Sequence, residues 1–113
     1  MFAHRGSARI TPADGAHLLK YGAARDRDDA CRDATGLNYR QLCALVAVVV
    51  RHRLGLVTTR RTLDEFFVRT EGFGAGGAPI ELTRKSYLRE LGRDGGSMSY
   101  EPTRLGIAKV AGF

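Results

Sequence analysis

The sequence predicts a mainly α-helical single domain with one small β-hairpin. Capping residues precede several segments whose apolar residues have helical spacing, and one late turn is followed by an alternating pattern. That turn is Asp94-Gly95-Gly96, after which Met98 and Tyr100 alternate with serines as in a β-strand. With 113 residues and 43% hydrophobic side chains, the chain is large enough to bury one core.

The N-terminal third is predicted to be a flexible lead followed by helix. Residues 1–10 form the lead, and residues 11–113 form the single domain. Thr11-Pro12-Ala13-Asp14 places a capping residue, a proline and an acid where a helix begins. We expect that helix to reach about Ala24. The charge-dense residues 25–33 are expected to form a solvated helical face or a connector, which Thr35-Gly36 interrupts.

A buried helix is predicted over residues 39–54. Asn38 and Gln41 have the spacing of a capped helix start, and the apolar run 42–50 follows them. The three consecutive valines also suit a strand, because β-branched residues favour strands. The length of the segment and the stop at Gly55 favour the helix.

A further helix is predicted over residues 59–71. Thr62 and Glu65 have capping-box spacing, and Leu63, Phe66 and Phe67 lie on one helical face. The glycine-rich residues 72–77 that follow lack the lysine and hydroxyl residue of a phosphate-binding loop, so they are interpreted as a flexible hinge or a loop.

The most clearly delimited helix is predicted over residues 83–91. Thr83 is a suitable N-cap, Leu82 and Tyr87 have the spacing of a hydrophobic staple, and Gly92 is a suitable C-terminal stop. The apolar stripe would comprise Tyr87, Leu88 and Leu91, with Arg84, Lys85 and Arg89 largely outside it.

The last residues are predicted less sharply. Pro102 stops the strand that contains Met98 and Tyr100, or confines it to a sheet edge. Residues 103–110 suit either a closing strand or a short helix.

The order and spacing of these segments resemble the winged helix-turn-helix DNA-binding proteins, over roughly residues 38–110. Small phage replication and regulatory proteins that use this fold share the resemblance. It implies that helix 59–71 supports a recognition helix over 83–91, with 39–54 behind them and 94–100 forming a wing. One feature departs from the pattern, because residues 72–82 replace the usual turn of about 3–4 residues.

The resemblance also implies a set of DNA-contacting residues. Arg84, Lys85 and Ser86 would occupy the leading turn of the recognition helix and read base edges. The other contacts, to the backbone and beside the wing, would come from Arg60, Arg61, Arg89, Arg93 and Arg104.

The charge distribution favours an anionic partner. Residues 34–113 carry twelve basic and seven acidic side chains, and therefore +5 of the formal net charge of +6. Such a field favours nucleic acid, an anionic membrane surface or an acidic protein. The arginine-rich, alanine-rich composition is equally typical of a GC-rich genome, so charge alone leaves these alternatives open.

Catalysis, cofactors and metal binding are not expected. His4, His17, His52, Cys31 and Cys43 show no paired ligand spacing. We expect both thiols to be reduced, because the chain is interpreted as cytoplasmic. The longest apolar run, 42–50, falls short of the ~20 residues of a membrane span.

We therefore expect a small, basic, non-enzymatic protein that binds double-stranded DNA. It would be a regulatory or replication accessory factor of a prokaryote, phage or plasmid. The alternative is a protein-binding module, an inhibitor or assembly subunit, whose basic surface meets an acidic protein. RNA binding is a third possibility that requires exposed aromatic side chains, whereas Tyr87 and Tyr100 are expected in the core.

Overall fold

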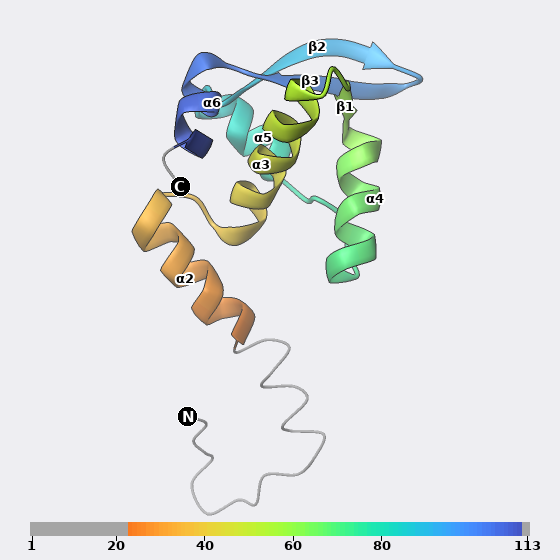
Figure 1. Ribbon diagram of the computed structural model, residues 1–113. Helices are drawn as coiled ribbons and strands as arrows, with labels where there is room; N and C mark the ends of the chain where they lie inside the picture. Colours follow the sequence, from red (N-terminus) through yellow and green to blue (C-terminus); the bar gives the residue numbers. More distant parts are fainter. Residues whose placement is uncertain (1–22, 112–113) are drawn as a thin grey trace, which may run out of the picture. The chain divides into compact units, whose positions relative to one another are not determined.

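The computed structural model describes residues 23–111, which belong to two compact units, Met1–Tyr39 and Arg40–Phe113 (Figure 1). The described part of the first unit is dominated by α2 (Ala23–Thr35). Thr35 Oγ1 donates to Cys31 O at 2.7 Å in the last turn, and Gly36 follows with φ +76°. Of the two alternatives for the charged residues 25–33, a helical face or a connector, the structure has the helix.

Two expectations fall on residues 1–22, outside the described part of the chain. These are the flexible lead over 1–10 and the helix from Thr11, of which only Ala23 and Ala24 are described, as the first residues of α2. The expectation that 11–113 form one domain stays a prediction.

The second unit contains helices α3 to α6 and one antiparallel sheet. In chain order its elements are α3 (Tyr39–Arg53), β1 (Thr58–Thr59), α4 (Arg60–Glu71), α5 (Ala78–Arg84), β2 (Leu88–Asp94), β3 (Ser97–Pro102) and α6 (Arg104–Ala111). The strand order is β1-β3-β2, and β2 with β3 forms a long hairpin (Figure 1). This is a mainly helical winged-helix fold, as the sequence predicts.

The predicted helix over 39–54 is confirmed as α3, and its valines belong to a helix. Ala44, Leu45, Val48 and Val49 are buried, which is the spacing of one helical face rather than of a strand. No helix among residues 23–111 is long and apolar enough to cross a membrane.

The predicted helix over 59–71 is confirmed as α4, but its cap lies earlier than predicted. Thr59 is the N-cap, and its Oγ1 accepts from Thr62 N at 3.1 Å. Gly72 ends the helix in the left-handed conformation. Leu63 and Phe67 are buried and anchor α4 in the core.

The predicted helix over 83–91 is wrong. α5 begins at Ala78 and ends at Arg84, and Thr83 lies inside it, where its hydroxyl donates to Pro79 O at 2.8 Å. The following residues form β2, because pairing with β3 along the ladder from Leu88 to Asp94 outweighs local helix propensity.

A β-bulge explains why this strand mimics a helix in the sequence. The ladder skips one residue between Glu90 and Gly92, so Leu91 is inserted and the apparent spacing from Leu88 becomes helical. Gly92 serves the bulge with φ +114° instead of ending a helix.

Two further expectations are resolved by the second unit. Only residues 72–77 separate α4 from α5, so the turn is shorter than the predicted 72–82. Pro102 is the last residue of β3, which is the central strand and not an edge.

The last segment is a helix, α6, and it packs closely against the start of β2. Thr103 Oγ1 accepts from Gly106 N at 3.1 Å, as an N-cap does. A Cβ placed on Gly106 would lie 2.1 Å from Tyr87 O, so only glycine fits this contact.

Candidate nucleic-acid interface

The candidate interface consists of α5 and the β2–β3 hairpin, which follow each other directly in the chain. On α5, Ala78, Pro79 and Leu82 are buried, so the helix is anchored by one side. Ile80 and Arg84 are exposed on the other side, with Glu81 partly exposed between them. The exposed side of α5 is therefore short and mixed in character.

The predicted base-reading residues lie at the end of α5 and not in its leading turn. Arg84 is the last helical residue, Lys85 is the C-cap, and Ser86 occupies the turn with φ +66°. Cations at this end interact favourably with the helix dipole. The predicted position in the leading turn of a helix is therefore wrong, because α5 begins at Ala78 and ends at Arg84.

The remaining predicted contact residues are spread over three elements. Arg60 and Arg61 are the first residues of α4, Arg89 and Arg93 lie on β2, and Arg104 is the first residue of α6. Arg89 and Arg93 thus belong to the hairpin that follows α5 in the chain. Arg104 lies after the hairpin, at the start of α6.

Ion pairs occupy several of these cations. Arg84 Nη1 lies 2.7 Å from Glu81 Oε1, and Arg60 Nε lies 3.1 Å from Asp64 Oδ2. Arg89 pairs with Glu101 across the hairpin. Formal charges cancel over 78–102, where four basic side chains face four acidic ones: Arg84, Lys85, Arg89 and Arg93, and Glu81, Glu90, Asp94 and Glu101.

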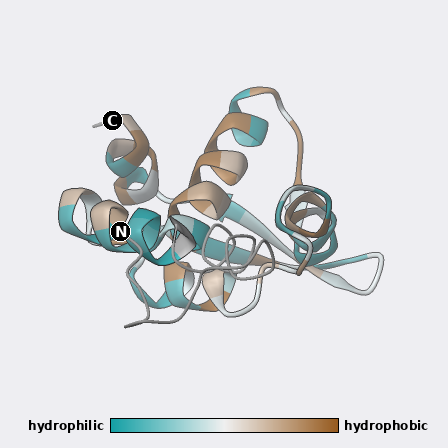
Figure 2. Ribbon diagram, turned by 90° about the horizontal axis from the view of Figure 1, so that it is seen from below, coloured by the Kyte–Doolittle hydropathy of each residue, from teal (hydrophilic) through white to brown (hydrophobic). Residues whose placement is uncertain are grey.

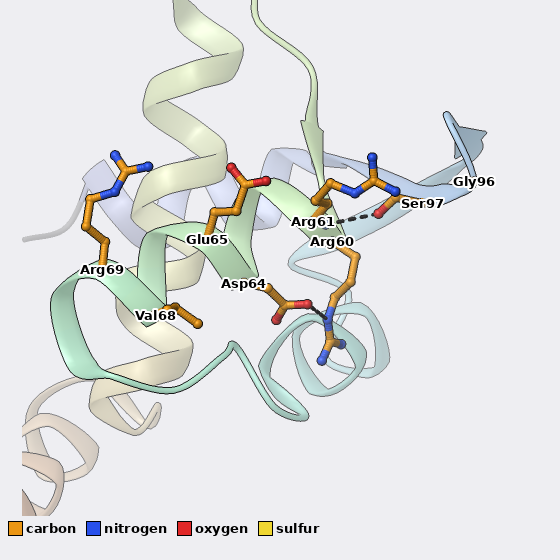
Figure 3. Close-up of a pocket in the computed structure, with 8 residues that line it drawn as sticks. All are labelled: Arg60, Arg61, Asp64, Glu65, Val68, Arg69, Gly96 and Ser97. Carbon is orange, nitrogen blue, oxygen red and sulfur yellow. Dashed lines mark hydrogen bonds and ion pairs between the residues drawn. The ribbon is translucent and has the colours of Figure 1, made fainter.

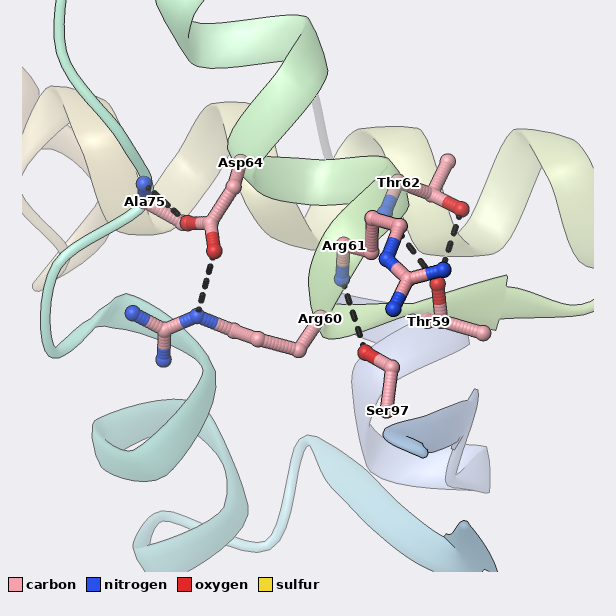
Figure 4. A network of polar contacts seen from close by, with 7 residues as sticks. All are labelled: Thr59, Arg60, Arg61, Thr62, Asp64, Ala75 and Ser97. Carbon is pink, nitrogen blue, oxygen red and sulfur yellow. Dashed lines mark hydrogen bonds and ion pairs between the residues drawn. The ribbon is translucent and has the colours of Figure 1, made fainter. Parts of the chain in front are cut away.

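The tip of the hairpin is tied to the first turn of α4. Ser97 Oγ accepts from the Arg61 backbone N–H at 3.0 Å (Figure 4), and the Arg61 side chain donates to Gly95 O at 3.4 Å. Arg93 donates to Gly96 O at 3.0 Å within the same turn. These bonds restrict the wing tip, since they join residues from two distant parts of the chain.

Asp64 joins α4 to the glycine-rich turn that leads into α5. Its Oδ1 accepts from the buried Ala75 N at 2.8 Å, and its Oδ2 accepts from Arg60 Nε (Figure 4). A Cβ on Gly74 would lie 2.9 Å from Asp64 Oδ1. The turn 72–77 is therefore a loop with defined contacts, as one of the two predicted alternatives, a flexible hinge or a loop, has it.

Arg40 supports the same turn from α3. Its guanidinium carbon lies 4.3 Å from the centre of the Phe73 ring, at cation–π distance. A Cβ on Gly76 would lie 2.7 Å from Arg40 Nη1, and Gly76 has φ +59°. Two contacts from different helices thus fix the position from which α5 starts.

Tyr100 lies on β3 in the hairpin and is buried, as the sequence predicts. Burial raises the pKa of the Tyr100 hydroxyl above its ordinary value of 10.0, and the carboxylate of Glu90 raises that pKa further. Arg60 acts in the opposite direction through its charge and a hydrogen bond to Tyr100. Tyr87 is half-buried.

An open hollow lies between the hairpin tip and the outer face of α4 (Figure 3). Its lining is mixed in charge, with three arginines and two acids, so it does not present a single sign to a ligand. The residues that line it are Arg60, Arg61, Asp64, Glu65, Val68, Arg69, Gly96 and Ser97.

Among residues 23–111 no three His, Cys, Asp or Glu side chains are grouped as metal ligands. Cys31 and Cys43 are not joined in a disulfide.

The sequence prediction missed Ile80 and Glu81 as exposed residues of α5. Both lie before the predicted start at Thr83. The available signal was Pro79, because proline is favoured at the first helical positions, followed by an acid in the first turn.

Solved structures with a similar fold are transcription regulators. S. aureus MepR in a complex with DNA matches with a TM-score of 0.66 and 17% identity, over 95% of this chain and 75% of that one. MepR, a transcription regulator of the S. aureus multidrug efflux pump MepA, also matches in a second structure, with a TM-score of 0.57 and 11% identity, over 90% of this chain and 73% of that one. A cysteine-to-serine mutant of E. coli MarR matches with a TM-score of 0.55 and 14% identity, over 94% of this chain and 75% of that one. No protein-family model matches the sequence, and no curated protein matches it.

Proposed function

We propose that this protein binds double-stranded DNA and catalyses no reaction. It would act in the cytoplasm as a regulatory or replication accessory factor of a prokaryote, phage or plasmid. The observation that carries the proposal is the winged-helix arrangement, in which a supporting helix, a braced turn, α5 and the hairpin follow in order. The similarity in fold to MepR, solved in a complex with DNA, supports it.

In this proposal α5 enters the major groove and the hairpin lies along the backbone. Arg84 contacts a base edge, while Lys85 and Ser86 contact a base edge or a phosphate beside it. Arg89 and Arg93 contribute phosphate contacts from the hairpin, with Arg60, Arg61 and Arg104 contributing at its margins. Glu81 is a new participant, because it holds Arg84 and presents an acceptor on the same exposed side.

The balanced charge of residues 78–102 sets the expected strength of binding. A phosphate must compete with Glu81 for Arg84 and with Glu101 for Arg89. Both pairs are exposed, so opening them costs about 1 kcal/mol or less each. We therefore expect modest affinity for random DNA that falls with added salt.

The proposal is tested by a mobility-shift titration of random-sequence duplex DNA at two salt concentrations. Arg84→Ala with Lys85→Ala should weaken binding about tenfold and reduce the salt dependence, because two cationic contacts are lost. The matched control is Arg53→Ala with Arg69→Ala, which removes the same charge elsewhere and should change affinity less than about threefold. Absence of any shift at low salt, or equal loss in both variants, contradicts the proposal.

One observation favours the second candidate function, protein binding. Basic charge without nearby acids lies on α3 and not on α5 or the hairpin: α3 carries Arg40, Arg51 and Arg53 and no acidic residue. That charge adjoins exposed apolar side chains at the C-terminal end of α3.

A further inference from the structure

A cluster of large apolar side chains is exposed around the C-terminal end of α3. We call it the α3–β1 surface. Its members are between 41% and 69% exposed and comprise Val50, Leu54, Leu56, Val57 and Phe66. In Figure 2 the segment that leads from α3 to β1 is largely brown, where a surface loop is ordinarily polar. Several large exposed apolar side chains in neighbouring segments are typical of an interaction site.

The segment that presents these side chains is held rigidly. Arg51 Nε donates to Thr58 Oγ1 at 2.9 Å, and Arg51 Nη2 donates to Val57 O at 2.8 Å. Leu56 N donates to Arg51 O at 2.8 Å, and Leu54 N donates to the last turn of α3. The exposure of Leu54, Leu56 and Val57 is therefore a fixed feature, so binding there would cost little ordering entropy.

A hollow between α3 and α4 continues this surface. Arg51 belongs to both, since it lines the hollow opposite Phe66 and also fixes the segment before β1. Apolar and charged side chains both line it: the lining residues are Ala47, Arg51, Thr62, Leu63, Glu65, Phe66 and Arg69.

The charge around the surface is predominantly positive. Arg51 and Arg53 lie in the last turn of α3, and Arg69 on α4 lines the hollow together with Arg51. Among the described residues that line the hollow, Glu65 is the acidic one. Arg51 bonds to neutral acceptors, so its charge is not cancelled by the groups that hold it.

We propose that the α3–β1 surface docks an acidic amphipathic helix of a partner protein. The apolar side chains would receive the apolar stripe of such a helix, and the arginines would meet its carboxylates. This inference concerns a surface separate from α5 and the hairpin, and it stands whether or not the protein binds DNA.

Charge disfavours the two other occupants that the chain itself offers. In a two-fold contact between copies, each surface faces itself, so Arg51 and Arg53 would oppose their own equivalents. Residues 1–22 carry Arg5, Arg9 and Lys20 against Asp14 alone, so they are also basic. An acidic partner is the occupant that complements both the apolar and the charged parts.

The test is a selection of random ~16-residue peptides, displayed on phage, for binding to the full chain. We expect the enriched peptides to be acidic, with apolar residues at i, i+3, i+4 and i+7. Leu54→Ser with Val57→Ser should weaken their binding about tenfold, and Arg53→Glu should weaken acidic peptides selectively. The matched control is Leu105→Ser, which removes an equally exposed apolar side chain from α6 (52% exposed) and should leave binding unchanged.

Circular dichroism and thermal unfolding establish that the variants are folded. Enrichment of basic or neutral peptides overturns the proposal, as does binding that resists both Arg53→Glu and the double serine variant. A wild-type dimer that the double serine variant dissociates, measured by sedimentation, assigns the surface to a second copy instead. Binding to phosphatidylglycerol vesicles through these residues, with no acidic peptide enriched, assigns it to a membrane surface instead.

Discussion

A nucleic-acid-binding protein is expected to combine a projecting shape with positive charge, and this chain has the two in different regions. One is the α5–hairpin region, residues 78–102, and the other is the α3–β1 surface. The α5–hairpin region has the required shape, but its charges cancel and Arg84 and Arg89 are already paired. The α3–β1 surface has uncancelled positive charge, but its exposed side chains are apolar and no element projects from it. Shape and net charge therefore point to different partners within the second unit.

This difference shows why the net charge of +6 is a poor guide to the binding face. A net charge describes the whole chain, whereas a phosphate contact depends on cations that a local acid does not hold. Four changes to the chain would reveal how independent the two regions are.

The largest effect is expected where α6 supports the start of the hairpin. Gly106→Ala would place a Cβ 2.1 Å from Tyr87 O, a backbone atom that cannot move away without displacing β2. We expect a loss of about 3 kcal/mol or more in the free energy of unfolding. Gly77→Ala is the control, because a Cβ there meets nothing within 4 Å. Urea unfolding of the two variants should differ clearly, and equal stability would contradict the close packing of α6.

The second effect concerns the brace that positions α5. Asp64→Ala leaves the buried Ala75 N without its acceptor and should cost about 1–3 kcal/mol of stability. We expect DNA affinity to fall with it, while peptide binding at the α3–β1 surface is retained. Glu65→Ala, one residue further along α4, is the control for a lost carboxylate. Equal DNA affinity in the Asp64 and Glu65 variants would show that the turn needs no brace.

The third prediction concerns a variant that removes two negative charges from the α5–hairpin region. Glu81→Gln with Glu101→Gln frees Arg84 and Arg89, so affinity for random duplex DNA should rise about threefold to tenfold at low salt. Asp29→Asn with Asp33→Asn makes the same change in net charge but frees neither Arg84 nor Arg89, so it should have less than about a twofold effect. A titration in which both double variants gain equally would mean that net charge, and not the local pairs, controls binding.

The smallest effect is a pH dependence of the free energy of unfolding, which arises from Tyr100 on β3. Because the pKa of Tyr100 is raised above 10.0 in the folded chain, its contribution to stability is fully present below pH 10 and is lost as pH rises through the folded pKa. Tyr100→Phe should remove this alkaline decrement in the free energy of unfolding. An unchanged alkaline slope in the variant would assign the titration to another group.

Sequence alone identified the elements whose signals are local. α3 and α4 were predicted because their apolar residues keep helical spacing and Gly55 and Gly72 end them. The region around α5 was not, because β2 forms through pairing with a strand that follows it, and the bulge at Leu91 gives it helical spacing. Pairing and bulges depend on tertiary contacts that no single-segment pattern contains.

The candidate site shows the same division. Arg84, Lys85 and Ser86 were predicted as base-reading residues; all three are exposed, and their contact with DNA stays a prediction. Their place at the end of α5, and the Glu81 and Glu101 carboxylates that hold neighbouring arginines, follow from the true helix bounds and the hairpin register. The exposed apolar residues 54–57 had no signal in the sequence, because an apolar segment next to a strand is ordinarily buried.

The central claim is that DNA is bound by α5 and the hairpin and not by the α3–β1 surface. The most direct measurement is a nitrogen-15 NMR titration of the full chain with a duplex of about 20 bp at low salt. We predict that the amide signals of residues 80–86 and 89–97 shift, while those of 50–57 do not. Shifts centred on residues 50–57, with α5 and the hairpin unaffected, would contradict the account.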